Sequence, residues 1–151
     1  MAVVLAGGLL ASLPGPADAG TTLARGGFAT GGDQCHGHRA TIVGTRGADD
    51  LHGTGHRDVV ALRGGADTFV GRQGRDIVCG GGGDDLIRGG ADDDRVRGGA
   101  GDDRLGGGGG RDVLKGGAGD DSLRGGSDDD LCAGAFGKDT AAVCERTTGV
   151  P

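Results

Sequence analysis

Aspartate recurs every nine residues along most of this sequence. From Gly44 to Ala142 the chain divides without insertion into eleven nonapeptides, and the sixth place of each holds an aspartate. Carboxylates suit a hard divalent cation such as Ca2+, which takes six to eight oxygen ligands in proteins. The spacing therefore predicts a series of similar cation sites, with these candidate side-chain ligands: Asp49, Asp58, Asp67, Asp76, Asp85, Asp94, Asp103, Asp112, Asp121, Asp130 and Asp139.

Other places of the nonapeptide have equally regular chemistry. The first place is glycine in every unit except the one that begins at Leu62, and the fourth is glycine in eight units. Glycine permits positive φ, so these places favour a tight turn with backbone carbonyls directed inward. The eighth place is apolar in every unit and lies between two mostly polar places, which is typical of a short strand with one buried face. We therefore expect strands of about three residues, at places seven to nine.

Two such units make one coil of a solenoid: turn, strand, turn, strand. The predicted fold is all-β, a parallel β-roll of two sheets with 18 residues per coil, in which coils stack about 4.8 Å apart. The apolar eighth-place side chains of both sheets should meet in a thin interior. Each edge of the roll then carries a column of aspartates, one from every second nonapeptide.

Charge makes these columns unstable without a cation. Two unit charges about 4.8 Å apart repel by roughly 3–4 kcal/mol at an effective dielectric constant of about 20. A Ca2+ ion between two stacked loops could bind one aspartate from each and complete its shell with backbone carbonyls, whereas Mg2+ prefers a smaller octahedral shell and retains its waters. We therefore expect several Ca2+ ions and a roll that folds when they bind.

The pattern GGxGxDx(apolar)x resembles the calcium-binding nonapeptide of the RTX, or haemolysin-type, repeat family. Residues 80–85, 98–103, 107–112 and 116–121 match its first six places in full. The segments at 40–55 and 128–145 resemble small secreted repeat proteins of actinobacteria. The RTX resemblance implies ligation by the sixth-place aspartates and by loop carbonyls, here those of Gly81, Gly83, Gly99, Gly101, Gly108, Gly110, Gly117 and Gly119.

Some units depart from the pattern. Arg63 and Arg72 stand where glycine is preferred, so we expect looser turns there. Asp92 and Asp128 replace fourth-place glycines, either because aspartate tolerates left-handed geometry or because they add ligands. The fifth-place aspartates are expected to be solvated rather than coordinating: Asp84, Asp93, Asp102, Asp120 and Asp129.

The four cysteines predict two disulfides. Cys132 is an inward position and Cys144 lies just past the final unit, so a bridge between them would clamp the end of the solenoid. Cys35–Cys79 follows by elimination and requires residues 35–43 to fold back over the roll, because Cα atoms in a disulfide lie within about 7 Å. A thiolate and imidazole metal site at Cys35-His36-Gly37-His38 is the alternative.

Composition and the N-terminal segment bear on localisation. The chain has 39 glycines, no tyrosine and no tryptophan, and its formal net charge of −6 argues against a nucleic-acid partner. Residues 1–19 resemble a cleaved signal peptide, although no basic residue precedes Arg25, so either the true start differs or this interpretation is wrong. The expected domains are the signal peptide at 1–19, a linker and cap at 20–43, the roll at 44–142 and a tail at 143–151.

These features predict a secreted, extracellular calcium-binding repeat protein with disulfide bonds, no membrane span and no enzymatic activity. The chain contains no HExxH or GxSxG motif and only three serines. A calcium-stiffened adhesive or surface-associated protein is the alternative, and a permanently disordered polyanion is a further one. Self-association and a cell-surface partner are left open by the sequence.

Overall fold

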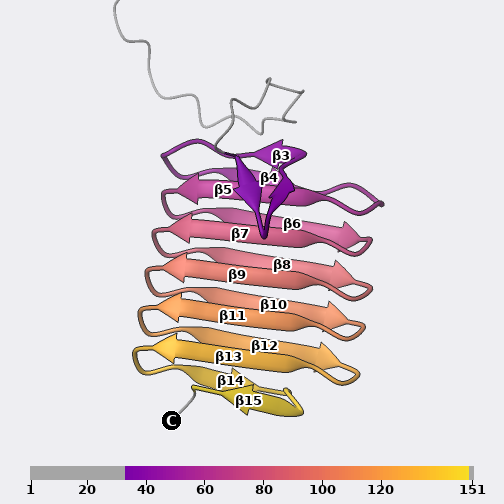
Figure 1. Cartoon of the computed structure of the whole chain (residues 1–151), viewed down its shortest axis with the longest axis vertical. Coiled ribbons are helices and arrows are strands. Elements are labelled where there is room, and N and C mark those ends of the chain that lie inside the picture. Colours follow the sequence, from indigo (N-terminus) through magenta and orange to yellow (C-terminus); the bar gives the residue numbers. More distant parts are fainter. Residues whose placement is uncertain (1–32, 150–151) are drawn as a thin grey trace, which may run out of the picture.

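The computed structural model describes residues 33–149, which form strands and turns without any helix. Among these residues no helix could therefore cross a membrane. Figure 1 shows a stack of strand pairs that rises along one axis. The strands are β1 (Gln34–Cys35), β2 (His38–Arg39), β3 (Ile42–Val43), β4 (Asp50–His52), β5 (Val59–Gly64), β6 (Thr68–Gln73), β7 (Ile77–Gly82), β8 (Leu86–Ala91), β9 (Arg95–Ala100), β10 (Arg104–Gly109), β11 (Val113–Ala118), β12 (Ser122–Ser127), β13 (Leu131–Phe136), β14 (Thr140–Ala142) and β15 (Arg146–Thr148).

Two parallel sheets make the solenoid. The odd sheet has seven strands in the order β15-β13-β11-β9-β7-β5-β3, and the even sheet has six in the order β14-β12-β10-β8-β6-β4. Within the repeats each strand pairs with the strand two nonapeptides away, so that Leu105 lies beside Ile87 on one side and Leu123 on the other. The predicted parallel β-roll with two nonapeptides per coil is confirmed.

The strands are longer than predicted. Strands β5 to β13 have six residues each and continue from the seventh place through the third place of the next nonapeptide. Only the fourth to sixth places form the turn. The extended pairing persists because glycine lets the coils approach closely: a Cβ at Gly99 or Gly117 would overlap the carbonyl of the glycine one coil before it.

The interior is a single apolar column, as predicted. The eighth-place side chains of both sheets are packed together, and Leu62, which replaces a first-place glycine, is buried among them. Because each nonapeptide contributes one apolar side chain, the column runs the length of the roll: Leu51, Val60, Phe69, Val78, Ile87, Val96, Leu105, Leu114, Leu123 and Cys132, with Ala141 partly buried at its end.

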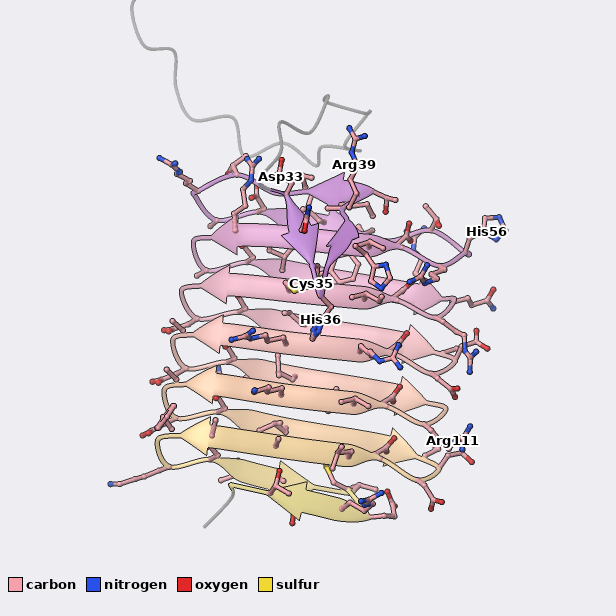
Figure 2. All side chains as sticks on the ribbon, in the orientation of Figure 1. Asp33, Cys35, His36, Arg39, His56 and Arg111 are labelled. Atoms are coloured by element: carbon pink, nitrogen blue, oxygen red, sulfur yellow. A yellow bond between two sulfur atoms is a disulfide. The ribbon has the colours of Figure 1, made fainter. Side chains whose placement is uncertain are left out.

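A small antiparallel hairpin of β1 and β2 covers part of the outer face of the odd sheet. Cys35 packs in a second apolar cluster with Val59 and Ile77, and it forms a disulfide with Cys79 across a Cα–Cα distance of 5.7 Å. Figure 2 shows Cys35 and His36 at the tip of this hairpin, over the sheet. The hairpin folds back over the roll as predicted, but the prediction for residues 35–43 is wrong at its end, because Ile42–Val43 pairs with β5 as the outermost strand of the odd sheet and extends the roll before residue 44. The two sulfurs are bonded to each other, which favours the disulfide over the thiolate and imidazole alternative.

The C-terminal end is closed by the Cys132–Cys144 disulfide, with a Cα–Cα distance of 6.0 Å. Strand β15 lies beyond the last nonapeptide and pairs in parallel with β13. The odd sheet therefore extends past the boundary expected at residue 142. The proposed signal peptide at 1–19 and most of the expected linker lie outside the described residues.

Candidate metal centre

The turns hold the sixth-place aspartates in two columns, one along each edge of the roll. The first edge carries the turns that lead from the odd sheet to the even sheet, and the second edge carries those that return. From Asp67 onward every sixth-place aspartate is 1–2% exposed, whereas Asp58 is 6% exposed and Asp49 is half-buried. The first-edge column is Asp49, Asp67, Asp85, Asp103, Asp121 and Asp139, and the second-edge column is Asp58, Asp76, Asp94, Asp112 and Asp130.

One oxygen of each carboxylate links neighbouring coils. The backbone N–H of Asp85 donates to Oδ1 of Asp103 at 2.9 Å, and the N–H of Asp94 donates to Oδ1 of Asp112 at 2.8 Å. The same bond joins every pair of sixth-place residues in successive coils, from Asp49–Asp67 to Asp121–Asp139. Each aspartate thus fixes the turn of the coil before it, a role that the sequence reasoning did not assign.

The second oxygen of these carboxylates is buried and lacks a hydrogen-bond partner among the described residues. This holds for Oδ2 of nine aspartates, all of those from the third nonapeptide onward. A buried carboxylate oxygen without a partner is costly, since its desolvation is not compensated. These nine atoms are the clearest indication that the turns can bind a cation: Oδ2 of Asp67, Asp76, Asp85, Asp94, Asp103, Asp112, Asp121, Asp130 and Asp139.

The first aspartate of each column is different. Oδ2 of Asp49 accepts the backbone N–H of Thr45 at 2.6 Å and its hydroxyl at 3.0 Å. Oδ2 of Asp58 accepts the same two donors from Thr54, at 2.7 and 3.0 Å. Threonine at the second place is the signal that distinguishes these two units, and its part in holding the aspartate was not predicted from the sequence.

Burial shifts the titration of the column. It raises the pKa of Asp76 and Asp103 to about 6 and that of Asp85, Asp94 and Asp112 to about 7, against the opposing effect of the backbone N–H bond. It also raises the pKa of Asp67, Asp121 and Asp130. Without a cation Asp85, Asp94 and Asp112 are therefore only partly ionised near neutral pH.

Glycines make room for the carboxylates. A Cβ at Gly98 or Gly107 would overlap the sixth-place aspartate of the same unit, so only glycine leaves this space open. All eight glycines whose carbonyls are candidate ligands have positive φ, between +102° and +140°. These eight are Gly81, Gly83, Gly99, Gly101, Gly108, Gly110, Gly117 and Gly119.

The irregular units keep the same backbone. Arg63 and Arg72 adopt φ values of 81° and 83°, so their turns follow the glycine geometry instead of loosening. Asp92 and Asp128 adopt 76° and 78°, and their carboxylates accept N–H groups from the fourth-place glycines of the preceding coil at 3.1 and 3.3 Å. The geometry favours the interpretation that aspartate is tolerated at these left-handed positions.

The fifth-place aspartates form a second, outer ladder. Oδ1 of Asp84 and of Asp102 each accepts the backbone N–H of the fifth-place residue in the next coil, at 2.9 and 2.8 Å. On the second edge Asp93 accepts the N–H of Arg111 and pairs with Arg75. Figure 2 shows Arg111 and His56 projecting outward on the same side of the roll.

The residues fit a hard cation. Nine buried carboxylates in two columns, each with one oxygen held by a backbone N–H and one without a partner, define a metal-binding parallel β-solenoid. The family model for the RTX calcium-binding nonapeptide repeat matches the chain in four copies, at residues 43–78, 70–105, 80–114 and 106–141. These matches cover about two-thirds of the chain, which therefore belongs to the RTX calcium-binding nonapeptide repeat family. No curated protein and no solved structure matches it.

Proposed function

We propose that this protein is a secreted calcium-binding repeat protein whose β-roll folds when Ca2+ binds along both edges. The observation that carries the proposal is the set of nine buried Oδ2 atoms without a partner. Bound Ca2+ supplies positive charge to these atoms. The second- and fourth-place glycine carbonyls are the proposed remaining ligands, and Thr45 and Thr54 would close the columns where Asp49 and Asp58 already have donors.

Folding on binding follows from the electrostatics of the columns. Carboxylates in successive coils that are buried and ionised together raise the free energy of the ion-free roll, and an ion that binds only the folded chain lowers it. The extracellular location is part of the proposal, because weak sites with Kd around 10⁻⁴–10⁻³ M are typical of extracellular calcium modules. The two disulfides are consistent with an oxidising compartment.

A calcium titration tests this function. The protein is placed in chelator and its far-UV circular dichroism is followed while Ca2+ is added, with Mg2+ as the control. We expect a cooperative gain of β signal with Ca2+ alone, reversed by chelator. A full β signal before Ca2+ is added would refute folding on binding, and no response to either ion would refute the site assignment.

A structural role at a surface is the second candidate function, and no catalysis is proposed. The exposed part of the odd sheet beside the hairpin is basic, with Arg95, Arg97 and Lys115 in adjacent strands. Burial and then the charges of these cationic side chains lower the pKa of His36 at the hairpin tip. Binding of the protein to whole cells, with and without chelator, tests this role. We expect calcium-dependent binding that is lost in an Arg97→Gln, Lys115→Gln variant.

A further inference from the structure

The second-edge column does not end with the last nonapeptide on that edge. Asp130 is its final aspartate, and one coil later the chain has left the repeat pattern. Its backbone N–H nevertheless has an acceptor, Oε2 of Glu145, at 2.7 Å. In every earlier coil that acceptor is Oδ1 of the next sixth-place aspartate.

Strand register gives Glu145 the same structural place. Leu131 pairs with Arg146, so Arg146 occupies the position that a seventh-place residue holds elsewhere. The N–H of Arg146 donates to the carbonyl of Asp130 at 3.1 Å, as seventh-place residues do throughout the roll. Glu145, immediately before Arg146, is therefore at the sixth place, although it follows Asp130 by 15 residues and thus by less than two full nonapeptides.

The three missing residues come out of the strand before the turn. Between Ala142, at a ninth place, and Arg146 the chain has only three residues where a regular unit has six, and β14 accordingly has three residues instead of six. The Cys132–Cys144 disulfide holds this short turn against the core, where Cys144 is partly buried. Glutamate has one methylene group more than aspartate, and this extra length lets a carboxylate from the shortened segment reach the Asp130 N–H.

Asp130 also has the buried, unpartnered carboxylate oxygen found in the earlier coils. Asp130 is 1% exposed, and its Oδ2 is buried without a hydrogen-bond partner in the described part of the chain. Asp130 and Glu145 line the same open hollow along the second edge, about 810 Å³ in volume. Neither of the two ion pairs found within residues 33–149 involves Glu145.

We propose that Asp130 and Glu145 together bind a terminal Ca2+ ion, with Glu145 held in place by the Cys132–Cys144 disulfide. Glu145 lies outside all four matched repeat copies, so the repeat motif does not assign it. The inference rests on the proposed function, since it adds one carboxylate and one ion to the same column. It also gives the disulfide a role in calcium binding as well as in closing the end of the solenoid.

The test measures how many Ca2+ ions bind per chain, by isothermal titration calorimetry, in the unaltered full chain and in two variants of it. Glu145→Gln is the decisive variant, because a glutamine oxygen can still accept the Asp130 N–H while the charge is lost. Asp129→Asn is the matched control, since it removes one exposed carboxylate from the same turn region. We expect Glu145→Gln to bind one ion fewer per chain, and Asp129→Asn to bind as many as the unaltered protein.

Two further measurements distinguish the outcomes. In the presence of Ca2+, hydrogen exchange at the Asp130 amide should stay slow in Glu145→Gln, because the glutamine oxygen can still accept its hydrogen bond. With the amide protected in this way, the loss of one ion reports the loss of a ligand and not local unfolding of the C-terminal end. A Cys132→Ala, Cys144→Ala variant should lose the same single ion. Unchanged stoichiometry in Glu145→Gln, in a protein that still folds with calcium, overturns this inference alone. Absence of calcium binding by the unaltered chain overturns the proposed function and this inference with it.

Discussion

Acidification should fold the roll in the absence of calcium. The carboxylates of the columns have pKa values that burial raises, so the folded chain binds protons more tightly than the unfolded chain. The contribution of each such group to stability is therefore complete at low pH and is lost as pH rises through its folded pKa. Protonation neutralises the columns as calcium does, and in chelator the roll should become more stable as pH falls from 8 to 6.

The magnitude follows from the pKa values. Asp85, Asp94 and Asp112 have a folded pKa of about 7, and each gains about 1 kcal/mol between pH 8 and pH 6. Asp76 and Asp103, with a pKa of about 6, each add about half of that or less. The total is on the order of 4 kcal/mol, or roughly a thousandfold in the folding equilibrium constant.

Far-UV circular dichroism in chelator, at a series of pH values from 8 down to 6, measures this effect. The pH stays above the pI of about 5.0 to limit aggregation, and sedimentation velocity checks for it. In Asp94→Asn the asparagine oxygen can still accept the Asp76 N–H, so the pH-dependent gain should shrink by about 1 kcal/mol. A β signal in chelator that is flat or falls between pH 8 and pH 6 would refute the reasoning.

Other consequences concern the glycines, the core and the threonine caps. Gly108→Ala should lower the free energy of unfolding of the calcium-loaded protein by at least about 1–2 kcal/mol, because φ is +124° at this position. Gly109→Ala should be neutral, because no atom lies within 4 Å of the added methyl group. Equal melting temperatures for the two variants would contradict this. Leu114→Ala should lower the free energy of unfolding, measured by chemical denaturation, by about 2–5 kcal/mol because the side chain is fully buried. Val113→Ala should lower it by less than about 1 kcal/mol because Val113 is 39% exposed. Similar losses in the two variants would argue against the single core column. Thr54→Ala should lower the free energy of unfolding by about 1 kcal/mol, because it removes the hydroxyl hydrogen bond to Asp58, and it should leave the calcium stoichiometry unchanged. Loss of one bound ion in this variant would instead place Asp58 among the calcium ligands.

The repeat itself determined how much of the fold could be predicted. Aspartate in phase and an apolar eighth place specify a coil of two nonapeptides with one core, because a shift by one residue would expose the apolar eighth-place side chains. Both disulfides were predictable as well. Cys132 faces inward beside the chain end, and only a fold-back could bring Cys35 to Cys79.

The details that escaped prediction depend on single atoms. The nine-residue pattern does not indicate that Oδ1 and Oδ2 of one aspartate have different partners, because that difference arises from the contact between coils. Glu145 escaped because the loss of three residues between Ala142 and Arg146 takes it out of the sequence period, while the strand register keeps it in the column. The length of the strands was misjudged since first- and second-place glycines suggested a turn, yet they permit close pairing of extended backbone.

The alternation of the two edges has an evolutionary consequence. Successive nonapeptides turn on opposite edges, and each coil contacts the next through residues two nonapeptides apart. Loss or duplication of two nonapeptides would leave every downstream residue on its own sheet and edge. Loss of a single nonapeptide would move all downstream residues to the opposite sheet and edge, so that Glu145 would continue the first-edge column. A loss between Asp92 and Asp128 would also place these two residues on opposite edges. Within this architecture we therefore expect related chains to differ in length by even numbers of nonapeptides more often than by odd numbers.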